Sequence, residues 1–297
     1  RSSWKRVRRV QIVEKAPVKI NLGLDTLFEH PNGDKEWDMV MTSVDLADYV
    51  MLESLHTNRI EVVTDSGFLP NDRRNLAFQA VSVLKRYCHV DRGVRIKIRK
   101  AIPVAAGLGG GSSDAAAVLR GLNRMWNLHL DLATLARLGL QVDSDVPYCV
   151  YSQTAHVTGK GDVVTPLPKL PPMWIILAKP KVSVSTPNIL RQVNYERIDQ
   201  HPNIEALLAG IQQQDFAEIF ANMGNVLEPI TAKRYPEILQ IKRQLLTFGA
   251  DAAQMSGTGP TVFGVCRKQS RAQRVYNSLK GFCREVYLVR PVNLNEH

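Results

Sequence analysis

The chain has 297 residues, of which 44% are hydrophobic and 22% charged, a composition typical of one large or two ordinary globular domains. Its apolar runs are too short for a membrane-spanning helix, and its four cysteines and seven histidines lack the spacing of a disulfide framework or a structural zinc site. The net charge of +10 would suit a nucleic-acid partner, but residues 1–9 hold five of the basic residues and no acid, and the remaining positive charge suits phosphate-bearing ligands.

The first nine residues form a separate basic segment. RSSWKRVRR has no apolar stretch that could serve as the core of a signal peptide. We therefore expect residues 1–9 to be a basic arm or a cloning remnant outside the fold. We also expect a cytoplasmic protein whose cysteines are free thiols in a reducing compartment.

Strand and helix patterns are mixed in the first half of the chain. Val94, Ile96 and Ile98 alternate with Arg95 and Lys97, as in a strand with one exposed face. The predicted strands are 10–24, 40–52, 59–64, 94–98 and 148–158. The predicted helices are 75–87, 114–126 and 131–140, the last begun by Asp131 as N-cap.

A proline-rich segment separates this half from the next. PLPKLPP, residues 166–172, holds four prolines and predicts a linker or domain border. After it we predict strands 174–178 and 285–289, helices 204–212, 216–223, 236–248 and 270–279, and two strands within 254–266 around a Gly-Thr-Gly-Pro turn. Because strands and helices do not alternate strictly, the pattern favours an α+β fold, with domains at 10–165 and 173–292.

The most informative stretch is PVAAGLGGGSSD, residues 103–114. Glycine lets backbone amides approach an anion, and the helix that follows adds free N–H groups and the positive end of its dipole. The stretch therefore predicts a nucleotide phosphate site, although a flexible turn or close packing would produce similar glycines. It is neither a Walker A sequence, since no Gly-Lys-Ser/Thr closes it, nor a protein kinase loop, since HRD and DFG do not follow.

Three stretches together resemble the galactokinase, homoserine kinase, mevalonate kinase and phosphomevalonate kinase (GHMP) superfamily. KAPVKINLGL (15–24) is similar to its first motif, PVAAGLGGGSSD to its second, and MSGTGPTVFGV (255–265) to its third. DSDVP (143–147) is similar to the acidic segment of the 4-diphosphocytidyl-2-C-methyl-D-erythritol kinase family. The resemblance spans about residues 14–290 and implies a ribosomal S5 domain 2-like N-terminal half and a ferredoxin-like C-terminal half.

The resemblance implies which residues bind ATP and act. Lys19 and Asp145 match the catalytic pair: Asp145 would orient or deprotonate the acceptor hydroxyl, and Lys19 would stabilise charge on the phosphoryl group. Ser112 or Ser113 would reach the magnesium ion that accompanies ATP, although Ser112 could instead only cap a helix. The implied ATP-binding residues are Pro103, Val104, Ala105, Ala106, Gly107, Leu108, Gly109, Gly110, Gly111, Ser112, Ser113, Asn75 and Lys100, the last of which could also be a solvated strand end.

The acceptor pocket is where this sequence departs from the family. Asn32-Gly33-Asp34-Lys35 stands where the family has Asp-Gly-Tyr-His, and Leu190 replaces a second aromatic residue. Since base stacking on an aromatic ring contributes about 1–3 kcal/mol, ATP chemistry is better supported than cytidine recognition unless another ring, such as Trp37, substitutes. The implied substrate-binding residues are Asn21, Asp34, Lys35, Thr186, Gly257, Thr258 and Gly259.

The implied activity is ATP-dependent phosphorylation of the 2-hydroxyl of 4-diphosphocytidyl-2-C-methyl-D-erythritol, a step of non-mevalonate isoprenoid biosynthesis, with ATP and Mg²⁺ as cofactors. One alternative is a GHMP-type kinase with a different acceptor, and another is a non-catalytic S5-like nucleic-acid-binding protein. The intact Lys19, Asp145 and three motifs disfavour a nucleic-acid partner. The expected partner is a small-molecule substrate, with no membrane, and the protein is expected to be a monomer or homodimer.

Overall fold

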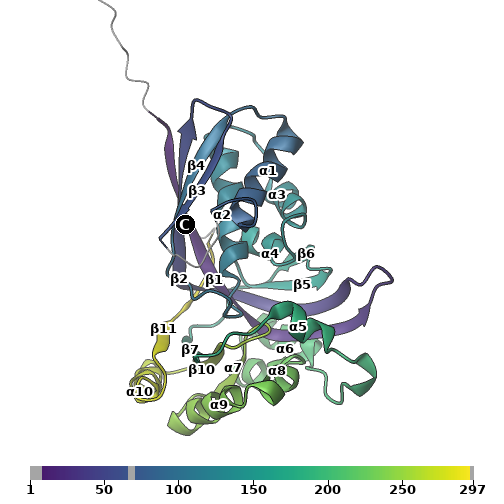
Figure 1. Cartoon of the computed structure of the whole chain (residues 1–297). Coiled ribbons are helices and arrows are strands. Elements are labelled where there is room, and N and C mark those ends of the chain that lie inside the picture. Colours follow the sequence, from purple (N-terminus) through teal and green to yellow (C-terminus); the bar gives the residue numbers. More distant parts are fainter. Residues whose placement is uncertain (1–8, 66–70, 295–297) are drawn as a thin grey trace, which may run out of the picture. The chain divides into compact units, whose positions relative to one another are not determined.

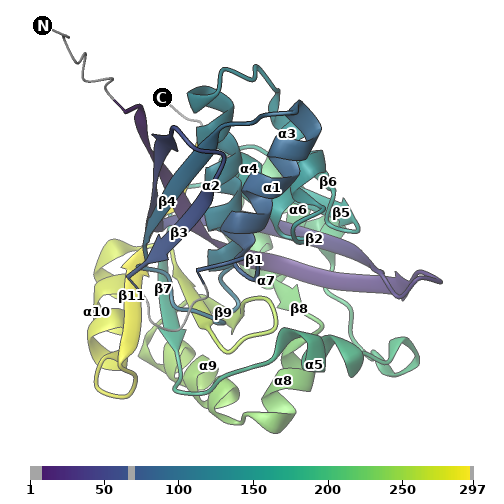
Figure 2. The same ribbon diagram turned by 45° about the horizontal axis from the view of Figure 1, so that its top comes forward.

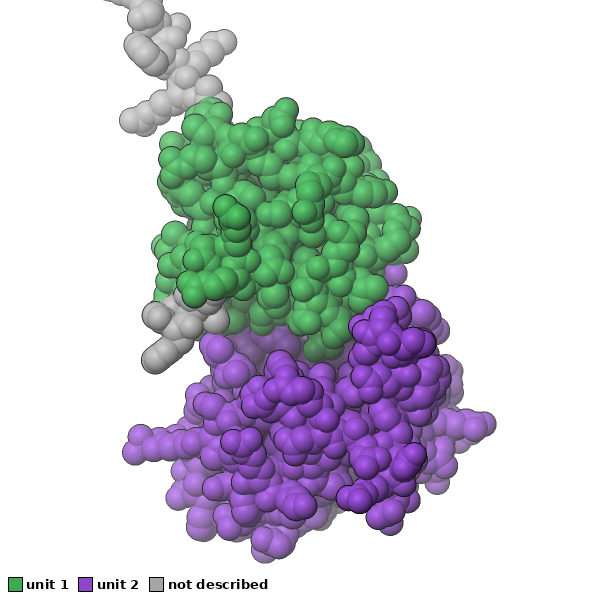
Figure 3. All heavy atoms as spheres, turned by 45° about the vertical axis from the view of Figure 1, so that its right-hand side comes forward, with its two compact units in different colours: residues 1–16, 47–101, 111–150 green, residues 17–46, 102–110, 151–297 purple. Residues whose placement is uncertain are grey.

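The computed structural model describes residues 9–65 and 71–294 and divides into two compact units (Figure 3). Unit 1 comprises residues 1–16, 47–101 and 111–150, and unit 2 comprises residues 17–46, 102–110 and 151–297. Two long strands, β1 (Gln11–Glu29) and β2 (Lys35–Leu55), contribute residues to both units. Of the predicted basic arm, all but Arg9 lies outside the described residues.

Unit 1 is a sheet covered by helices. Strand β4 (Gly93–Arg99) pairs antiparallel with β2, from Tyr49 opposite Arg99 to Leu55 opposite Gly93, and parallel with β3 (Ile60–Thr64). The helices are α1 (Leu76–Cys88), α2 (Gly110–Met125), α3 (Leu132–Gly139) and α4 (Val146–Tyr151). Figures 1 and 2 show α1, α2 and α3 on one side of β3 and β4, so the alternating apolar residues of these strands face the helices.

Local capping explains where two of these helices begin. The side chain of Asn75 accepts a hydrogen bond from the Ala77 amide at the start of α1. The side chain of Asp131 accepts one from Thr134 at the start of α3, which confirms the predicted N-cap.

The predicted strand at 148–158 is wrong in its first part. Residues 146–151 form α4, and a strand, β5 (Ala155–Gly159), begins only afterwards. The apolar run VPYCVY is too short for its period to separate helix from strand. The buried guanidinium of Arg120 donates to the carbonyl oxygens of Cys149 and Val150, which satisfies polar groups at the end of this short helix.

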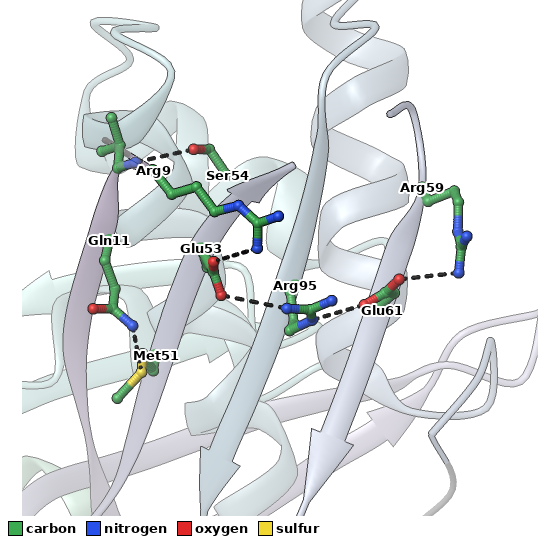
Figure 4. Close-up of polar contacts among 9 residues, drawn as sticks. Arg9, Gln11, Met51, Glu53, Ser54, Arg59, Glu61 and Arg95 are labelled. Atoms are coloured by element: carbon green, nitrogen blue, oxygen red, sulfur yellow. Dashed lines mark hydrogen bonds and ion pairs between the residues drawn. The ribbon is translucent and has the colours of Figure 1, made fainter. Parts of the chain in front are cut away.

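The side of the unit 1 sheet away from the helices carries a charge ladder, formed by Arg9, Glu53, Arg95, Glu61 and Arg59 (Figure 4). Glu53 accepts from Arg9 at 3.0 Å and lies 3.5 Å from the Arg95 guanidinium. Glu61 accepts from Arg95 at 2.8 Å and from Arg59 at 3.0 Å. The signs therefore alternate across neighbouring strands, as cross-strand charge pairs require.

Unit 2 contains a four-stranded antiparallel sheet of order β11-β7-β10-β9. Its strands are β7 (Trp174–Lys179), β9 (Ala252–Met255), β10 (Val262–Cys266) and β11 (Glu285–Val289), and it packs against α9 (Glu237–Phe248) and α10 (Gln269–Leu279). The chain order β7-α9-β9-β10-α10-β11 with this strand order is ferredoxin-like, which confirms the predicted fold of the C-terminal half.

The other elements of unit 2 extend β1 and β2. Strands β5 and β12 (Pro291–Val292) pair with β2, β6 (Val163–Pro166) pairs with β5, and β8 (Gly224–Asn225) pairs with β1. Helical segments are α5 (Thr186–Arg191), the 3₁₀ turn η1 (Tyr195–Arg197), α6 (Ile204–Gln212), α7 (Phe216–Ala221) and α8 (Glu228–Arg234). Sequence patterns predicted α6 and α7 but not β6, α5 or α8.

One hydrophobic core holds unit 2 together. It joins Val18 and Ile20 of β1 to Ile175 of β7 and Phe263 of β10, all fully buried. The core also takes Ala106 and Leu108 from the glycine-rich stretch and Ile102 from just before it, so apolar side chains anchor that stretch. Leu170 and Met173 are buried in the same core, and the domain border predicted at 166–172 stays a prediction. Among the described residues, no helix is long and apolar enough to span a membrane.

Candidate active site

Lys19 of β1 is a buried lysine held by one amide side chain. It is 4% exposed, and its Nζ donates to Asn21 Oδ1 at 3.0 Å. The same oxygen accepts from the backbone N–H of Gly257 at 3.0 Å. Asn21 therefore connects the first motif to the third, and it fixes the ammonium group of Lys19 beside the Gly257 turn.

The glycine-rich stretch, residues 103–113 and hereafter the phosphate loop, lies directly against Lys19. The Lys19 amide donates to the Leu108 carbonyl at 3.1 Å. Gly107 and Gly109 have positive φ angles of 79° and 65°. A Cβ at Gly107 would lie 2.3 Å from the Ser256 carbonyl oxygen, and one at Gly109 would lie 2.7 Å from Lys19 Cγ. Glycine is thus required at these two positions, whereas Gly110 and Gly111 have no positive φ.

The third motif closes against the phosphate loop within unit 2. Ser256 Oγ donates to the Gly107 carbonyl at 2.8 Å, and the Thr261 amide donates to the Ala106 carbonyl. Thr258 Oγ1 lies 2.8 Å from Thr186 Oγ1, so two predicted substrate residues form one hydrogen-bonded pair. Gly259 has a φ of 83° and precedes Pro260 in the turn.

Asn225 of β8 is a site residue that sequence reasoning missed. Its Nδ2 donates to the carbonyl oxygens of Met255 and Gly257, and its Oδ1 accepts from the Leu227 amide. The side chain thereby fixes the backbone of the third motif from behind. A lone asparagine between two helical patterns gives no sequence signal for this contact.

In unit 1, the first turn of α2 is joined to the acidic segment. Ser112 Oγ donates to Asp143 Oδ2 at 2.8 Å. Sequence reasoning did not identify Asp143 as the partner of this serine. Ser113 is fully buried. Asp145 is partly exposed and stands immediately before α4, where its carbonyl accepts from the Cys149 amide. Ser112 is not the N-cap of α2, because the helix begins at Gly110 and the Ser112 hydroxyl donates to Asp143. Its contact with magnesium stays a prediction.

Lys100 is not a solvated strand end, so this one of its two predicted roles is wrong. Its side chain is 8% exposed, and its Nζ lies 2.5 Å from Asp48 Oδ2 and 2.9 Å from Asp114 Oδ2. Burial lowers the pKa of Lys100, but Asp114 and Asp48 outweigh it, so the pKa lies above its usual value. Burial raises the pKa of Asp114 well above its usual range, and the adjacent Asp48 adds to this effect. A proton on Asp114 would leave the three residues with one positive and one negative charge.

Two further predictions concern Asn75 as a nucleotide-binding residue and the residues that would hold magnesium. Asn75 is 8% exposed, and its oxygen is engaged by the Ala77 amide as the N-cap of α1. Among the described residues, no group of three or more His, Cys, Asp or Glu side chains is arranged to hold a metal ion. A magnesium ion at this site would therefore need ligand oxygens from the nucleotide as well as from protein residues such as Ser112.

Two of the predicted substrate-binding residues, Asp34 and Lys35, lie at the hairpin between β1 and β2. Asp34 pairs with Lys160 at 3.1 Å, and this hydrogen bond, with that of Asn32, lowers the pKa of Asp34. Lys35 Nζ lies 5.3 Å from the ring centre of Tyr195, whose hydroxyl is 3.0 Å from Thr26 Oγ1. Tyr195 is thus an aromatic ring beside Lys35, and the suggestion that Trp37 could stack on the base stays a prediction.

Comparisons with known proteins show which families this chain resembles. The family model of the GHMP kinases N terminal domain matches residues 75–153, and that of GHMP kinases C terminal matches residues 204–285. A 4-diphosphocytidyl-2-C-methyl-D-erythritol kinase of Lactiplantibacillus plantarum is 99% identical over 288 residues, which cover 97% of this chain and 100% of the relative. The enzyme of that name from Levilactobacillus brevis is 66% identical over 284 residues, 95% of this chain and 100% of the relative.

Solved structures show the same relationship. A crystal structure of 4-(cytidine 5'-diphospho)-2C-methyl-D-erythritol kinase is similar with a TM-score of 0.78 and 28% identity, covering 94% of this chain and 99% of that one. Homoserine kinase from Cytophaga hutchinsonii has a TM-score of 0.79 at 20% identity, covering 98% of both chains, which shows the shared fold.

Proposed function

This chain belongs to the GHMP kinases and, within them, to the 4-diphosphocytidyl-2-C-methyl-D-erythritol kinases, and on that premise we propose that Lys19 and Asp145 carry its phosphoryl transfer. The protein is an ATP-dependent small-molecule kinase. The acceptor atom we propose is the 2-hydroxyl of 4-diphosphocytidyl-2-C-methyl-D-erythritol, in non-mevalonate isoprenoid biosynthesis in the cytoplasm.

The observation that carries the assignment is the junction of three motifs at Lys19. Asn21 holds the Lys19 ammonium beside Gly257, and Gly109 lies against the lysine stem. An ammonium group fixed beside two glycine-rich turns suits a triphosphate, because ammonium groups and backbone amides both stabilise the charge that develops on the transferred phosphoryl. The phosphate loop, from Pro103 to Ser113, would hold the ATP phosphates through its backbone N–H groups.

The remaining residues have proposed roles in binding and positioning. Asp145 would orient or deprotonate the acceptor hydroxyl, which needs a carboxylate that stays ionised. Ser112, aligned by Asp143, would contribute an oxygen to a magnesium ion bound with ATP. Asn75 would border the adenosine, and the paired hydroxyls of Thr186 and Thr258 would contact the acceptor. ATP supplies the phosphoryl group, and these residues position it for transfer.

Substitution of the two catalytic candidates tests this proposal. Asp145→Asn and Lys19→Ala should each lower kcat by about 10²-fold or more, the usual scale of acid–base and electrostatic assistance. ADP release in the presence of ATP and 4-diphosphocytidyl-2-C-methyl-D-erythritol measures the effect. Asp131→Asn is the matched control, because it makes the same chemical change at an exposed N-cap of unit 1 and should keep kcat. Wild-type turnover in both active-site variants would exclude the pair.

The charged acceptor hairpin favours a second candidate, a kinase of this family with another acceptor. Asp34 and Lys35 are engaged with Lys160 and Tyr195, and neither offers a ring face to cytosine. The double change Asp34→Tyr with Lys35→His should tighten binding of the cytidine compound about tenfold if only stacking is missing. Calorimetric titration separates the outcomes. Tight binding by the unmodified chain that is lost in Tyr195→Leu would assign the base contact to Tyr195, and no binding by any form would favour the other acceptor.

A further inference from the structure

Three buried charged residues of unit 1 have no part in the chemistry proposed above. Asp48 of β2 is fully buried, and it lies with Lys100 and Asp114 in the cluster described above, where no side chain is more than 8% exposed. Removing three ionisable side chains from water is expensive, and hydrophobic residues of similar size often stabilise a fold as well. Such a cluster therefore calls for a role beyond stability.

The cluster lies at both ends of the phosphate loop. Before the loop, Asp48 Oδ1 accepts from the Ala101 amide at 2.7 Å, and Asp48 Oδ2 accepts from Lys100 Nζ. After the loop, Asp114 of α2 accepts a hydrogen bond from the same Lys100 ammonium group. One aspartate on a central strand thus fixes the backbone where the loop begins, and the lysine connects that point to the residue where the loop ends.

We propose that Asp48 is a positioning residue for ATP, which acts by holding the two ends of the phosphate loop at a fixed separation. The proposal rests on the function proposed above. Three residues of the loop, Ala105, Gly107 and Gly109, have positive φ angles. A glycine-rich segment of this kind loses much conformational entropy on ordering, so fixed ends lower the cost of presenting its amides to an anion.

This placement gives Lys100 a role different from the one that the family resemblance implied. A lysine in the adenosine pocket would contact the nucleotide directly. Here its ammonium is enclosed by Asp48 and Asp114 at hydrogen-bond distance. The two roles make different predictions, because only the positioning role makes Asp48 as important for ATP binding as Lys100.

The test combines kinetics with hydrogen exchange of the free enzyme. Asp48→Asn should raise the KM for ATP by about tenfold to a hundredfold with a smaller change in kcat, the scale of loss from a misplaced binding group. Mass spectrometry should show that amides of residues 102–113 exchange about tenfold faster in this variant, because the loop opens locally. Lys100→Met should reproduce both effects, and Lys100→Arg should restore part of each.

Val94→Ala is the matched control for loss of stability. Val94 is fully buried at the opposite end of β4 from Lys100, so its truncation destabilises unit 1 without touching the loop. This variant should lower the midpoint of urea unfolding and leave both loop exchange and the KM for ATP as in the wild type.

Two outcomes would overturn the proposal. Wild-type loop exchange and KM in Asp48→Asn would show that the cluster is only structural. Weak ATP binding in Lys100→Met alone, with Asp48→Asn normal, would return Lys100 to the nucleotide pocket. Because exchange is measured without substrate, failure of the enzyme to phosphorylate the cytidine compound would count against the proposed acceptor and not against the positioning role.

Discussion

Two networks of charged side chains lie on opposite faces of the same two strands in unit 1. Asp48, in step with the buried Val50 and Leu52, faces the helices and meets Lys100 just beyond β4. Glu53 faces the other way and belongs to the charge ladder with Arg95 (Figure 4). The nitrogen–oxygen distances are 2.5 and 2.9 Å in the buried cluster and 3.5 and 2.8 Å around Arg95 in the ladder. The larger contrast is in exposure, because Asp48 is fully buried and the side chain of Arg95 is 41% exposed.

This difference shows that a short ion pair makes no fixed contribution to the free energy of unfolding. In water, salt and solvent screen the ladder, and its long side chains lose entropy on pairing. In the interior, each ion has lost its hydration, so every charge depends on its partners and removal of one leaves the others unsatisfied. The buried network can therefore hold the ends of the phosphate loop in place from β2, whereas the exposed side chains of the ladder can rearrange when one of them is changed.

The largest effect should come from a second buried cation of unit 1. Arg120 is enclosed with Glu14 and donates to three carbonyl oxygens, those of Lys15, Cys149 and Val150. Arg120→Met should lower the free energy of unfolding by about 3–5 kcal/mol, because it leaves Glu14 and these carbonyls without their donor. Urea denaturation measures this loss.

Arg124 provides the matched control, because it also pairs with Glu14 but its side chain is 54% exposed. Arg124→Met should cost less than about 1 kcal/mol. Equal losses in the two variants would contradict the claim that burial, and not pairing, sets the energy.

A smaller effect is expected from the pH dependence of the buried network. The folded-state pKa of Asp114 is raised by burial, above its value in the unfolded chain. Its contribution is therefore fully present at low pH and is lost as the pH rises through the folded-state pKa. Asp114→Asn should remove this loss, so that its stability changes less than that of the wild type between about pH 4, near the ordinary pKa of an aspartate, and about pH 8. Urea unfolding at both pH values measures it, and an unchanged difference would place the charged form in the folded protein.

A still smaller effect is expected on the exposed face. Glu53→Gln removes the carboxylate that Arg9 and Arg95 share. Its unfolding free energy should fall by less than about 1 kcal/mol, because the exposed guanidinium groups regain water. A loss as large as that of Arg120→Met would mean that the ladder acts as a rigid unit.

The smallest effect is the response of the ladder to salt. Glu61→Gln removes a carboxylate that accepts from Arg95 and Arg59 at the sheet surface. Its unfolding midpoint should differ from the wild type at low ionic strength and coincide with it at about 1 M salt, where the Debye length is about 3 Å. Arg120→Met should keep its full defect at both ionic strengths. Persistence of the Glu61→Gln defect at high salt would contradict the comparison.

Much of the fold followed from sequence patterns with a physical cause. The alternation of Val94, Ile96 and Ile98 predicted β4, and the position of Asp131 before an apolar helical run predicted the N-cap of α3. Residues 148–151 were wrongly predicted as strand, because an apolar run with tertiary partners shows no clear period over so short a length. Arg120 donates to the Cys149 carbonyl at the end of this helix from 29 residues away in the chain, a contact that no local pattern reveals.

The residues of the candidate site also divide into those that sequence motifs predicted and those that they did not. The glycines of residues 103–114 predicted a phosphate site, and the resemblance of KAPVKINLGL to a family motif implied roles for Lys19 and Asn21. These roles stay predictions. Asn225, Asp48 and Tyr195 were missed, since each is a single polar or aromatic residue whose role comes from a partner more than 30 residues distant in sequence. Tertiary contact, and not residue type, makes them part of the site.

The division of unit 2 into three chain segments affects the protein during its synthesis. The polypeptide passes between the units at residues 16/17, 46/47, 101/102, 110/111 and 150/151. When residue 150 has left the ribosome, unit 1 is whole, but Val18, Ile20 and Leu108 still lack Ile175 and Phe263, which are translated later. At about 5–20 residues per second, this apolar surface stays uncovered for seconds until β10 emerges, and we expect nascent chains to be prone to aggregation during that interval.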